Sequence, residues 1–224
     1  MIELLNMDCM DYMAGLPDEV FDIAIVDPPY GVNIAAKSHI GGTRQGLNKK
    51  WVNERVNHFD IKPWDSYPPP AGYFNELRRV SLHQIIFGGN YFTEHLNPTN
   101  GWVFWDKDAN TENLTFSEGE LAWTSFGKRM RKVCIPWLGF GQINTGEKKI
   151  HPTQKPVRLY RWILENYAKP GQRILDTHLG SGSSAIAAHY FGCDFVGTEL
   201  DPDYYAAAVK RFNAETSQIA MDLA

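Results

Sequence analysis

The sequence is poor in cysteine, and its cysteines have no spacing that would hold a metal ion. Cys9, Cys134 and Cys193 are the three cysteines among 224 residues, and they lie far apart. Disulfide frameworks and zinc sites are marked by paired cysteine spacings, which are missing here. The seven histidines contain no close ligand pair either. We therefore expect reduced thiols and no metal site.

Long hydrophobic runs are also missing. A helix that spans a bilayer needs about 20 consecutive apolar residues, and no stretch approaches that length. The chain begins Met1-Ile2-Glu3-Leu4, without the basic start and apolar run of a secretory signal. Its length suits one domain, which we expect over residues 1–224, and we find no internal repeat. These features predict a soluble cytoplasmic protein without a membrane partner.

The chain lacks the net positive charge that a nucleic-acid partner would favour, since its formal net charge is −4. However, residues 31–62 carry six basic and two acidic side chains, and residues 128–155 carry seven basic and one acidic. On one face these stretches would form a basic groove with salt-sensitive affinity for phosphates, although two solvated loops would have the same composition. The candidates for nucleic-acid contact are Lys37, Arg44, Lys49, Lys50, Lys128, Arg129, Arg131 and Lys132.

The most informative feature present is the corner Asp27-Pro28-Pro29-Tyr30, which follows the apolar run 21–26. Neither proline can donate to a β-ladder, so the chain must leave the sheet here. The prolines also restrict the backbone and give the Asp27 carboxylate a nearly fixed direction. The carboxylate, a backbone carbonyl and the Tyr30 ring can together grip a flat amine by hydrogen bonds and stacking. Taken alone, the corner is also consistent with an ordinary Asp-Pro turn.

A second motif combines a strand, a glycine turn and a helix. The strand ends at Asp176, the turn contains Gly180 and Gly182, and the next strand ends at Glu199, nineteen positions after Gly180. Glycines let the backbone approach a ligand closely, and a carboxylate at position 199 suits two ribose hydroxyls. The same glycine spacing permits a nicotinamide-dependent oxidoreductase. Asp176 suits an ammonium group and would repel a pyrophosphate, which favours an amino acid joined to a nucleoside.

A third motif, residues 151–156 with the sequence His-Pro-Thr-Gln-Lys-Pro, precedes a helical pattern. Pro156 suits the first helical turn. Thr153 and Lys155 there can hold a carboxylate, which is the other charged end of an amino acid. Without the first two motifs, this segment would be an ordinary polar helix start.

Together these motifs resemble the DNA amino-methyltransferases that use S-adenosylmethionine, in particular the permuted group in which the catalytic motif precedes the cofactor motif. Similarity at 87–92, 102–107 and 120–126 extends the resemblance over nearly the whole chain, and it is strongest to phage and prophage adenine methylases. The resemblance implies that Asp27, Pro28, Pro29 and Tyr30 are catalytic. It implies cofactor contacts from Asp8, Cys9, His151, Thr153, Gln154, Lys155, Pro156, Asp176, His178, Gly180, Ser181, Gly182, Glu199 and Leu200.

Two of these positions leave alternatives open. The family usually has Pro-Phe after the cofactor aspartate, where this chain has Thr177-His178. Whether the His178 ring replaces the aromatic packing of that phenylalanine is left open by the sequence. Asp8 resembles a contact to the adenine of the cofactor, and an N-cap for the following helix is its alternative role.

We expect an α/β fold: a doubly wound, mostly parallel sheet of seven strands with the Rossmann-like methyltransferase arrangement and, by the resemblance, an antiparallel edge. Ligands bind such sheets where the strand order reverses, so Asp27 and Asp176 should be neighbours. Residues 31–70 show neither the hydrophobic period of a helix nor that of a strand, which predicts a long substrate-binding loop. The expected strands are 2–6, 21–27, 83–88, 102–106, 119–125, 172–176 and 194–199. The first expected helix begins near residue 8, and the other four cover 73–80, 156–168, 182–191 and 202–212.

The resemblance implies methyl transfer from S-adenosylmethionine to N6 of an adenine flipped out of DNA, in a bacterial or phage-infected cell. Asp27 and the Pro28 carbonyl would orient N6 during a single displacement. Cytosine N4 is the nearest alternative acceptor, and a nicotinamide oxidoreductase or an inactive nucleic-acid-binding subunit are alternatives of other classes. Residues 124–150 form a minimal target-recognition segment, which predicts a short target read with help from 31–70 or from the second subunit of a homodimer.

Overall fold

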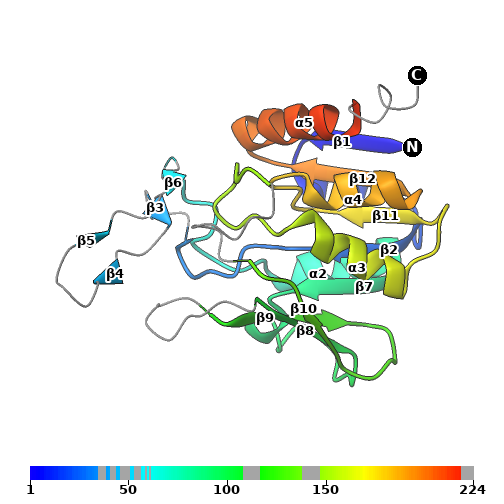
Figure 1. Ribbon diagram of the computed structural model, residues 1–224. Coiled ribbons are helices and arrows are strands. Elements are labelled where there is room, and N and C mark those ends of the chain that lie inside the picture. Colours follow the sequence, from blue (N-terminus) through cyan, green and yellow to red (C-terminus); the bar gives the residue numbers. More distant parts are fainter. Residues whose placement is uncertain are drawn as a thin grey trace.

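The computed structural model describes residues 1–34, 60, 62–107, 117–137 and 147–217, and the backbone of four short strands within 39–58. In this part of the chain, an eight-stranded sheet carries helices on both faces (Figure 1). Its strands are β1 (Ile2–Asn6), β2 (Phe21–Val26), β7 (Ser81–Phe87), β8 (Trp102–Asp106), β9 (Gly119–Thr124), β10 (Arg131–Cys134), β11 (Arg173–Asp176) and β12 (Asp194–Glu199). The predicted fold class is confirmed, with one strand more than expected, β10.

The strand order is β1-β12-β11-β2-β7-β9-β8-β10. All neighbours from β1 to β7 are parallel, whereas β9 is antiparallel to both β7 and β8. The sheet edge beyond β9 is a parallel pair, β8 and β10. The expectation of an antiparallel edge is therefore corrected: among the eight strands, β9 alone runs against the others, and it lies inside the sheet.

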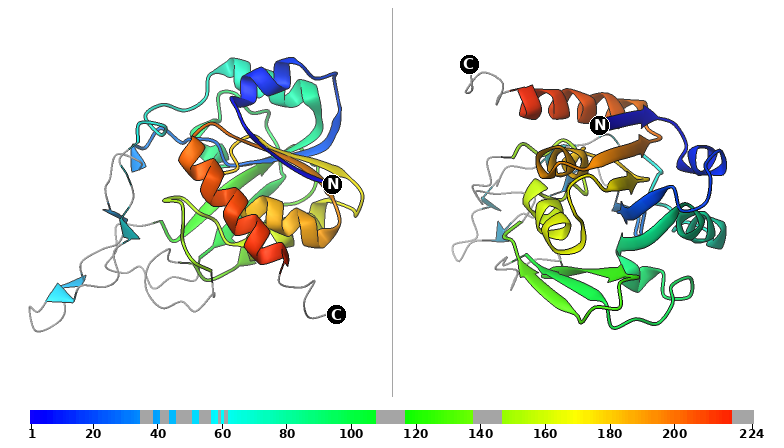
Figure 2. Two further views of the ribbon diagram at one scale, coloured as in Figure 1. Left: turned by 90° about the horizontal axis from the view of Figure 1, so that it is seen from above. Right: turned by 90° about the vertical axis from the view of Figure 1, so that its right-hand side faces the viewer.

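Five α-helices cover the sheet: α1 (Cys9–Ala14), α2 (Ala71–Val80), α3 (Val157–Tyr167), α4 (Ser183–Phe191) and α5 (Pro202–Ser217). Figure 2 shows α1 and α2 on one face and α3, α4 and α5 on the other. Alternate side chains of β7 point to opposite faces of the sheet, each of which has a hydrophobic core. Ile85 and Phe87 pack under α3 and α4, while Ile86 packs under α2. The small residues of α4 are buried, which lets this helix pack closely against α3 and β12.

The predicted long loop contains short regular structure. Strand β3 (His39–Ile40) pairs antiparallel with β6 (Asn57–His58), and β4 (Arg44–Gln45) pairs antiparallel with β5 (Trp51–Val52). Figure 1 shows these strands beside the main sheet, at the end where β2 finishes. The segment therefore extends from the same end of the sheet as the Asp27 corner.

Within the described residues, no helix is long and apolar enough to cross a membrane. The same residues contain no group of three histidine, cysteine, aspartate or glutamate side chains placed to hold a metal ion.

Candidate active site

Asp27 and Asp176 meet where the strand order reverses. Strands β2 and β11 are hydrogen-bonded neighbours, with Ile23 opposite Ile174 and Ala24 opposite Leu175. From this pair the chain continues outward in both directions, to β7 on one side and to β12 on the other. The predicted juxtaposition of the two aspartates at the carboxyl ends of adjacent strands is confirmed, and a ligand of a doubly wound sheet binds at such a reversal.

The Tyr30 side chain is held over the end of β2. Its hydroxyl donates to Asp27 Oδ1 at 2.7 Å, and its ring stacks on Tyr91 with centroids 5.0 Å apart. The ring lies against the backbone of Gly88, where a Cβ atom would collide with it and where φ is +67°. Only glycine therefore fits at position 88, since it lacks a Cβ and tolerates this φ.

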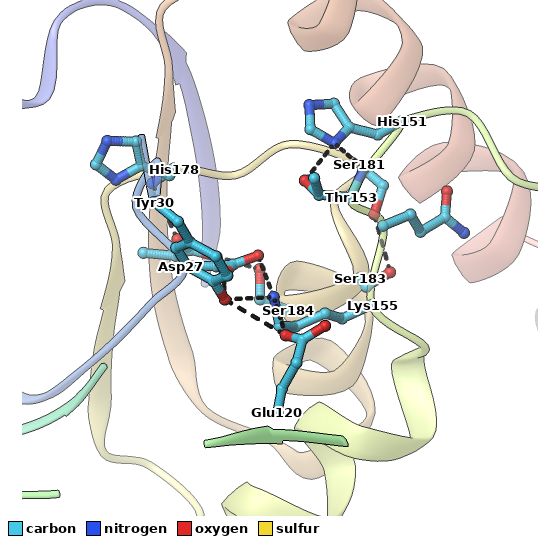
Figure 3. A network of polar contacts seen from close by, with 12 residues as sticks. Asp27, Tyr30, Glu120, His151, Thr153, Lys155, His178, Ser181, Ser183 and Ser184 are labelled. Atoms are coloured by element: carbon cyan, nitrogen blue, oxygen red, sulfur yellow. Dashed lines mark hydrogen bonds and ion pairs between the residues drawn. The ribbon is translucent and has the colours of Figure 1, made fainter. Parts of the chain in front are cut away.

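Lys155 joins the corner to the antiparallel strand β9. Its ammonium lies 2.5 Å from Asp27 Oδ2 and 3.2 Å from Glu120 Oε2, and its side chain is 3% exposed (Figure 3). Lys107 contacts the other oxygen of Glu120 at 2.7 Å. Two carboxylates and two ammonium groups thus form one largely buried network, in which Asp27 already accepts from both Tyr30 and Lys155.

Burial and charge act differently on the two carboxylates of this network. Burial raises the pKa of Asp27 above its ordinary value, although Lys155 opposes the shift. Burial acts in the same direction on Glu120, but the ammonium groups of Lys155 and Lys107 outweigh it and hold the pKa of Glu120 at about 2. Glu120 is therefore the permanent anion, and Asp27 is the more basic carboxylate.

Asp65 fixes the backbone of the Pro-Pro-Tyr corner. Its buried carboxylate accepts from the backbone N–H groups of Tyr30 at 2.9 Å, Gly31 at 3.0 Å and Ile34 at 2.8 Å. The segment around residue 65 thereby closes the turn that follows β2.

The glycine turn is ordered by two acidic side chains. Glu199 Oε2 accepts from the N–H of Gly180 at 2.8 Å, and buried Asp176 accepts from the N–H of His178 at 3.0 Å and from Ser184 Oγ at 2.6 Å. Gly180 and Gly182 have φ of +52° and +74°, which favours glycine. Burial raises the pKa of Asp176 to about 7 and also raises the pKa of Glu199.

The His151 segment forms a wall beside this turn. The His151 ring packs edge-on against Tyr204 at 4.3 Å, and burial lowers the pKa of His151 to about 3. Its Nδ1 lies 3.2 Å from Thr153 Oγ1. The buried Gln154 side chain bonds to the backbone of Lys148 and Ile150, so it orders its own loop.

Two cavities meet at Asp27. One, of about 730 Å³, lies over the glycine turn, and its lining includes Asp8, Thr177 and Glu199. The other, of about 770 Å³, lies over Tyr30, between Glu120 and Lys149. Both are lined by Asp27, Pro29, Trp64, Thr153, Gln154 and Lys155. A ligand in either cavity would therefore be in reach of the same carboxylate.

Comparison with known proteins points to the same family as the sequence motifs do. A protein-family model described as DNA methylase matches residues 102–210. Type II methyltransferase M2.DpnII of Streptococcus pneumoniae is 24% identical over 242 residues, which cover 95% of this chain and 90% of the relative. Both comparisons relate this chain to DNA methylases. The Haemophilus influenzae methylase M.HinfI is 23% identical, over 93% of this chain and 67% of its own length.

Solved structures share the fold of this methylase. The structure of M1.HpyAVI in complex with SAM has a TM-score of 0.57 and 19% identity, and the match covers 94% of this chain and all of that chain. PvuII DNA methyltransferase, described as cytosine-N4-specific, has a TM-score of 0.59 and 13% identity, over 94% and 86% of the two chains. These likenesses support the Rossmann-like methyltransferase fold.

The structure brings most of the predicted site residues of the methylase together. Asp8 caps α1 by accepting from the Met10 N–H at 2.7 Å, so the N-cap alternative is confirmed, and it also lines the 730 Å³ cavity. Pro156 is the N-cap of α3, and Leu200 is largely exposed at the cavity rim. The predicted cofactor residues that line this cavity are Asp8, Cys9, His151, Thr153, Gln154, Lys155, His178, Gly180, Ser181, Glu199 and Leu200.

The predicted basic residues are not all near the site. Lys128 donates to the Asn166 carbonyl at 3.0 Å, in the last turn of α3, and the Arg131 guanidinium lies 5.1 Å from the Trp162 ring centroid. The last turn of α3 lies at the far end of the sheet from Asp27. Exposed Arg129 follows Lys128, whereas Lys132 pairs with Asp106 at 2.7 Å. The side chains of Lys37, Arg44, Lys49 and Lys50 lie outside the described residues.

Four site residues of the methylase escaped sequence reasoning. Glu120 and Lys107 complete the buried network, and Asp65 holds the corner. Arg211 donates to the Ser181 carbonyl at 3.1 Å and to Ser183 Oγ at 2.8 Å, which ties α5 to the glycine turn. The charged pair of positions 118 and 120 at the start of an otherwise apolar strand was the signal available for Glu120.

Proposed function

We propose that this methylase transfers the methyl group of S-adenosylmethionine to N6 of an adenine flipped out of DNA. The observation that carries the proposal is that Asp27 stands in the wall shared by two cavities. The cavity over the glycine turn would take the methyl donor, and the cavity over Tyr30 would take the base. Their shared wall brings the two reactants to one carboxylate.

The residues of the first cavity fit an amino acid joined to a nucleoside. Glu199 would face a ribose, and the positive φ of Gly180 lets the backbone approach the ligand, whereas Gly182 packs against Ala208 outside the cavity lining. Thr153 lines the cavity and would hold the carboxylate, while Asp176, buried directly behind the lining residue Thr177, would hold the ammonium group. When bound, S-adenosylmethionine supplies an electrophilic methyl group on a positively charged sulfur.

Lys155 has a different role in this account from the one that the sequence suggested. Its ammonium is engaged with Asp27 and Glu120, so we assign it to the catalytic network, where it keeps Asp27 ionised. The base amine replaces Lys155 as a donor to Asp27 Oδ2, and Lys155 keeps Glu120 as its partner. Glu120 thereby lowers the cost of freeing Asp27.

The adenine amine is a weak nucleophile because its lone pair is delocalised into the ring. Asp27 and the Pro28 carbonyl accept its two hydrogens and favour a pyramidal nitrogen, while Tyr30 stacks on the ring. The new N–C bond forms as the S–C bond breaks, and the methylated nitrogen then loses a proton. Asp27 suits this step because burial raises its pKa. Flipping the base costs a few kcal/mol, which these contacts offset.

The remaining parts of the proposal concern specificity and context. Residues 124–150 offer little material for reading bases, which supports a short target, read with help from residues 31–70 or from a second subunit of a homodimer. DNA is the proposed substrate and the cytoplasm of a bacterial or phage-infected cell the proposed location. A methylase with its motifs in permuted order is part of the same proposal.

Incorporation of a labelled methyl group tests the proposal. The protein is incubated with DNA and methyl-labelled donor, and the DNA is digested to nucleosides and separated. We expect the label in N6-methyladenine and no transfer by Asp27→Ala, which should still bind the donor. Label in N4-methylcytosine would favour the cytosine alternative. Absence of label with every DNA would contradict methyl transfer and favour an inactive subunit or an oxidoreductase.

A further inference from the structure

A chain of hydrogen bonds runs along the wall of the glycine-turn cavity, through Tyr73, Thr177 and His178. The Tyr73 hydroxyl lies 2.6 Å from Thr177 Oγ1, and Thr177 Oγ1 lies 2.9 Å from His178 Nδ1. Tyr73 and Thr177 are 2% and 3% exposed, whereas His178 is half-buried and lines the cavity with them. The proposed catalytic step uses none of these three side chains.

The direction of this chain follows from counting hydrogens. Among the described residues, the Tyr73 hydroxyl has Thr177 Oγ1 as its only hydrogen-bond partner. If Thr177 donated to Tyr73, the buried phenol hydrogen would be left without an acceptor, which is costly. Tyr73 therefore donates to Thr177, and the Thr177 hydroxyl hydrogen is free to donate to His178 Nδ1.

This direction determines the tautomer of His178. Burial lowers the pKa of His178 to about 4, so the ring is neutral near pH 7 and carries one N–H. Since Nδ1 accepts from Thr177, the hydrogen is on Nε2, for which no described residue acts as acceptor. The ring is held by an edge contact to Tyr73 at 5.5 Å and by its own backbone N–H on Asp176.

We propose that His178 is a specificity-determining residue of the cofactor site, whose Nε2–H donates to an acceptor on the nucleoside of the methyl donor. The acceptor is an aromatic nitrogen or a ribose oxygen. Thr177 and Tyr73 are positioning residues, because they select the tautomer without touching the ligand. This inference rests on the proposed function, since it requires the donor to occupy the glycine-turn cavity.

Calorimetry with S-adenosylhomocysteine, the product of the donor, tests the hydrogen bond. His178→Phe keeps an aromatic ring and removes the donor, and we expect its Kd to rise about 2- to 12-fold, the usual worth of one hydrogen bond. His95→Phe is the matched control, because His95 stacks on Phe74 and lines neither cavity. An unchanged Kd for His178→Phe would overturn the inference. No binding by the wild type would instead overturn the proposed function.

Nitrogen NMR of ring-labelled histidine in the full chain tests the tautomer directly. We expect the Nε2–H form for His178 in the wild type and a mixture of tautomers in Thr177→Val. The Nδ1–H form in the wild type would overturn the inference, even in a protein that binds the ligand and transfers methyl groups.

Ligand analogues locate the acceptor. In each analogue of S-adenosylhomocysteine, one ring nitrogen is replaced by C–H or one ribose hydroxyl by hydrogen. One analogue should bind the wild type more weakly than S-adenosylhomocysteine does. The same analogue should bind the wild type and His178→Phe with equal affinity. A loss confined to a ring-nitrogen analogue assigns the contact to the base, and a loss confined to a ribose analogue assigns it to the sugar. No such analogue among the series would contradict the inference.

Discussion

At the scale of single residues, the site depends on carboxyl groups whose pKa values are shifted in different directions by burial and by neighbouring charges. Asp27 is largely buried and Asp176 fully buried, the pKa of both carboxyl groups is raised, and neither has a full countercharge of its own. Asp27 shares Lys155 with Glu120, and Asp176 accepts only from neutral groups. Buried groups of this kind cost stability and mark functional sites. In the proposed function, a cationic or amine ligand would be the missing partner of each carboxylate.

Glu120 provides a test of the catalytic network. Glu120→Gln removes the second anionic partner of Lys155, which then binds Asp27 more tightly and competes with the base amine. We expect kcat to fall about 10- to 100-fold, or about 1.4–2.7 kcal/mol, with little change in the Kd of the methyl donor. Single-turnover methylation and calorimetry measure the two quantities. The control is Glu165→Gln, whose ion pair with Arg161 is largely exposed on α3. Equal rates for both variants would refute this role.

Asp176 provides a pH test of donor binding. Its carboxyl must be ionised to hold an ammonium, and its pKa in the free protein is about 7. Binding to the ammonium lowers that pKa, so the affinity should fall as the pH drops below about 7 and become flat above it. Calorimetry across this range measures the effect. Asp176→Asn should bind weakly at every pH, and a pH-dependent affinity retained by this variant would contradict the assignment.

The same residue should weaken the fold. A carboxyl group with a raised pKa in the folded state lowers stability when ionised, so the penalty is present above about pH 7 and absent below its unfolded pKa of about 3.9. We expect Asp176→Asn to melt about 2–8 °C higher than the wild type at alkaline pH, and the difference to disappear in acid. Thermal unfolding at the two pH values measures it. A lower melting temperature at alkaline pH would contradict the sign.

Sequence reasoning could predict the groups that sit at strand ends, but not their partners. Asp27, Asp176 and Glu199 each end or follow a recognisable strand, and the structure places them where the sheet topology requires. Lys155 illustrates the limit: its motif suggested a carboxylate ligand, and the fold brings it to Asp27 and Glu120. Such pairings join segments far apart in sequence, so local patterns do not contain them.

At the scale of elements, the site depends on how the turn after β2 is held. Asp65 accepts from three backbone N–H groups of this turn, while Lys62 pairs with Asp201 and Asp203 at the start of α5. One short segment, 62–65, therefore bridges the Asp27 corner and the rim of the donor cavity. The bridge adds backbone hydrogen bonds to a corner whose side chains are already held by Tyr91 and Lys155.

Removal of the Asp65 carboxylate tests this bridge. Asp65→Ala leaves three N–H groups of the turn without their acceptor, and each loss of a buried partner costs about 1–3 kcal/mol before water compensates. We expect unfolding free energy to fall by about 2 kcal/mol or more and kcat to fall with it. Urea denaturation and methylation assays measure both. Asp60→Asn, at an exposed position, is the control. An Asp65→Ala protein with wild-type stability and rate would remove Asp65 from the account.

The elements themselves were largely predictable, because β2 and the second half of β7 are apolar runs and β12 begins shortly after the turn residue Gly192. Strand β10 was missed since only Val133 of its four residues is buried, so no period is visible. The direction of β9 was also beyond local patterns. A strand that inserts between two others is placed by tertiary pairing, and the local sequence of Gly119–Thr124 carries no signal for the direction in which it pairs.

At the scale of the whole molecule, the sheet has two functionally different ends. Asp27, Glu120 and both cavities lie at the carboxyl end of the parallel strands, whereas Lys128 packs on the last turn of α3 at the opposite end. A duplex that presents a flipped base to Tyr30 must extend along the protein to reach Lys128. Lys128 and Lys132, which were predicted together, therefore lie in different places relative to Asp27: Lys128 on the last turn of α3 and Lys132 beside Asp106.

Duplex length tests this division. We predict that Lys128→Gln with Arg129→Gln weakens binding of a duplex of about 40 base pairs and reduces its salt dependence, because phosphate contacts are lost. Binding of a duplex of about 12 base pairs centred on the target should not change, since such a duplex is only about 40 Å long. Titrations at several salt concentrations measure both. Equal losses for the two duplexes would place these residues beside the flipped base, against the observed geometry.

The central claim is that the glycine-turn cavity holds the methyl donor and the Tyr30 cavity holds the base, with Asp27 between them. A crystal structure of the protein with a DNA duplex and a non-reactive donor analogue tests it most directly. We predict the sulfonium position of the analogue beside the adenine amine, with that amine donating to Asp27 and the Pro28 carbonyl. A complex with either ligand bound away from these cavities, or with Asp27 still paired to Lys155 and remote from the amine, would contradict the account.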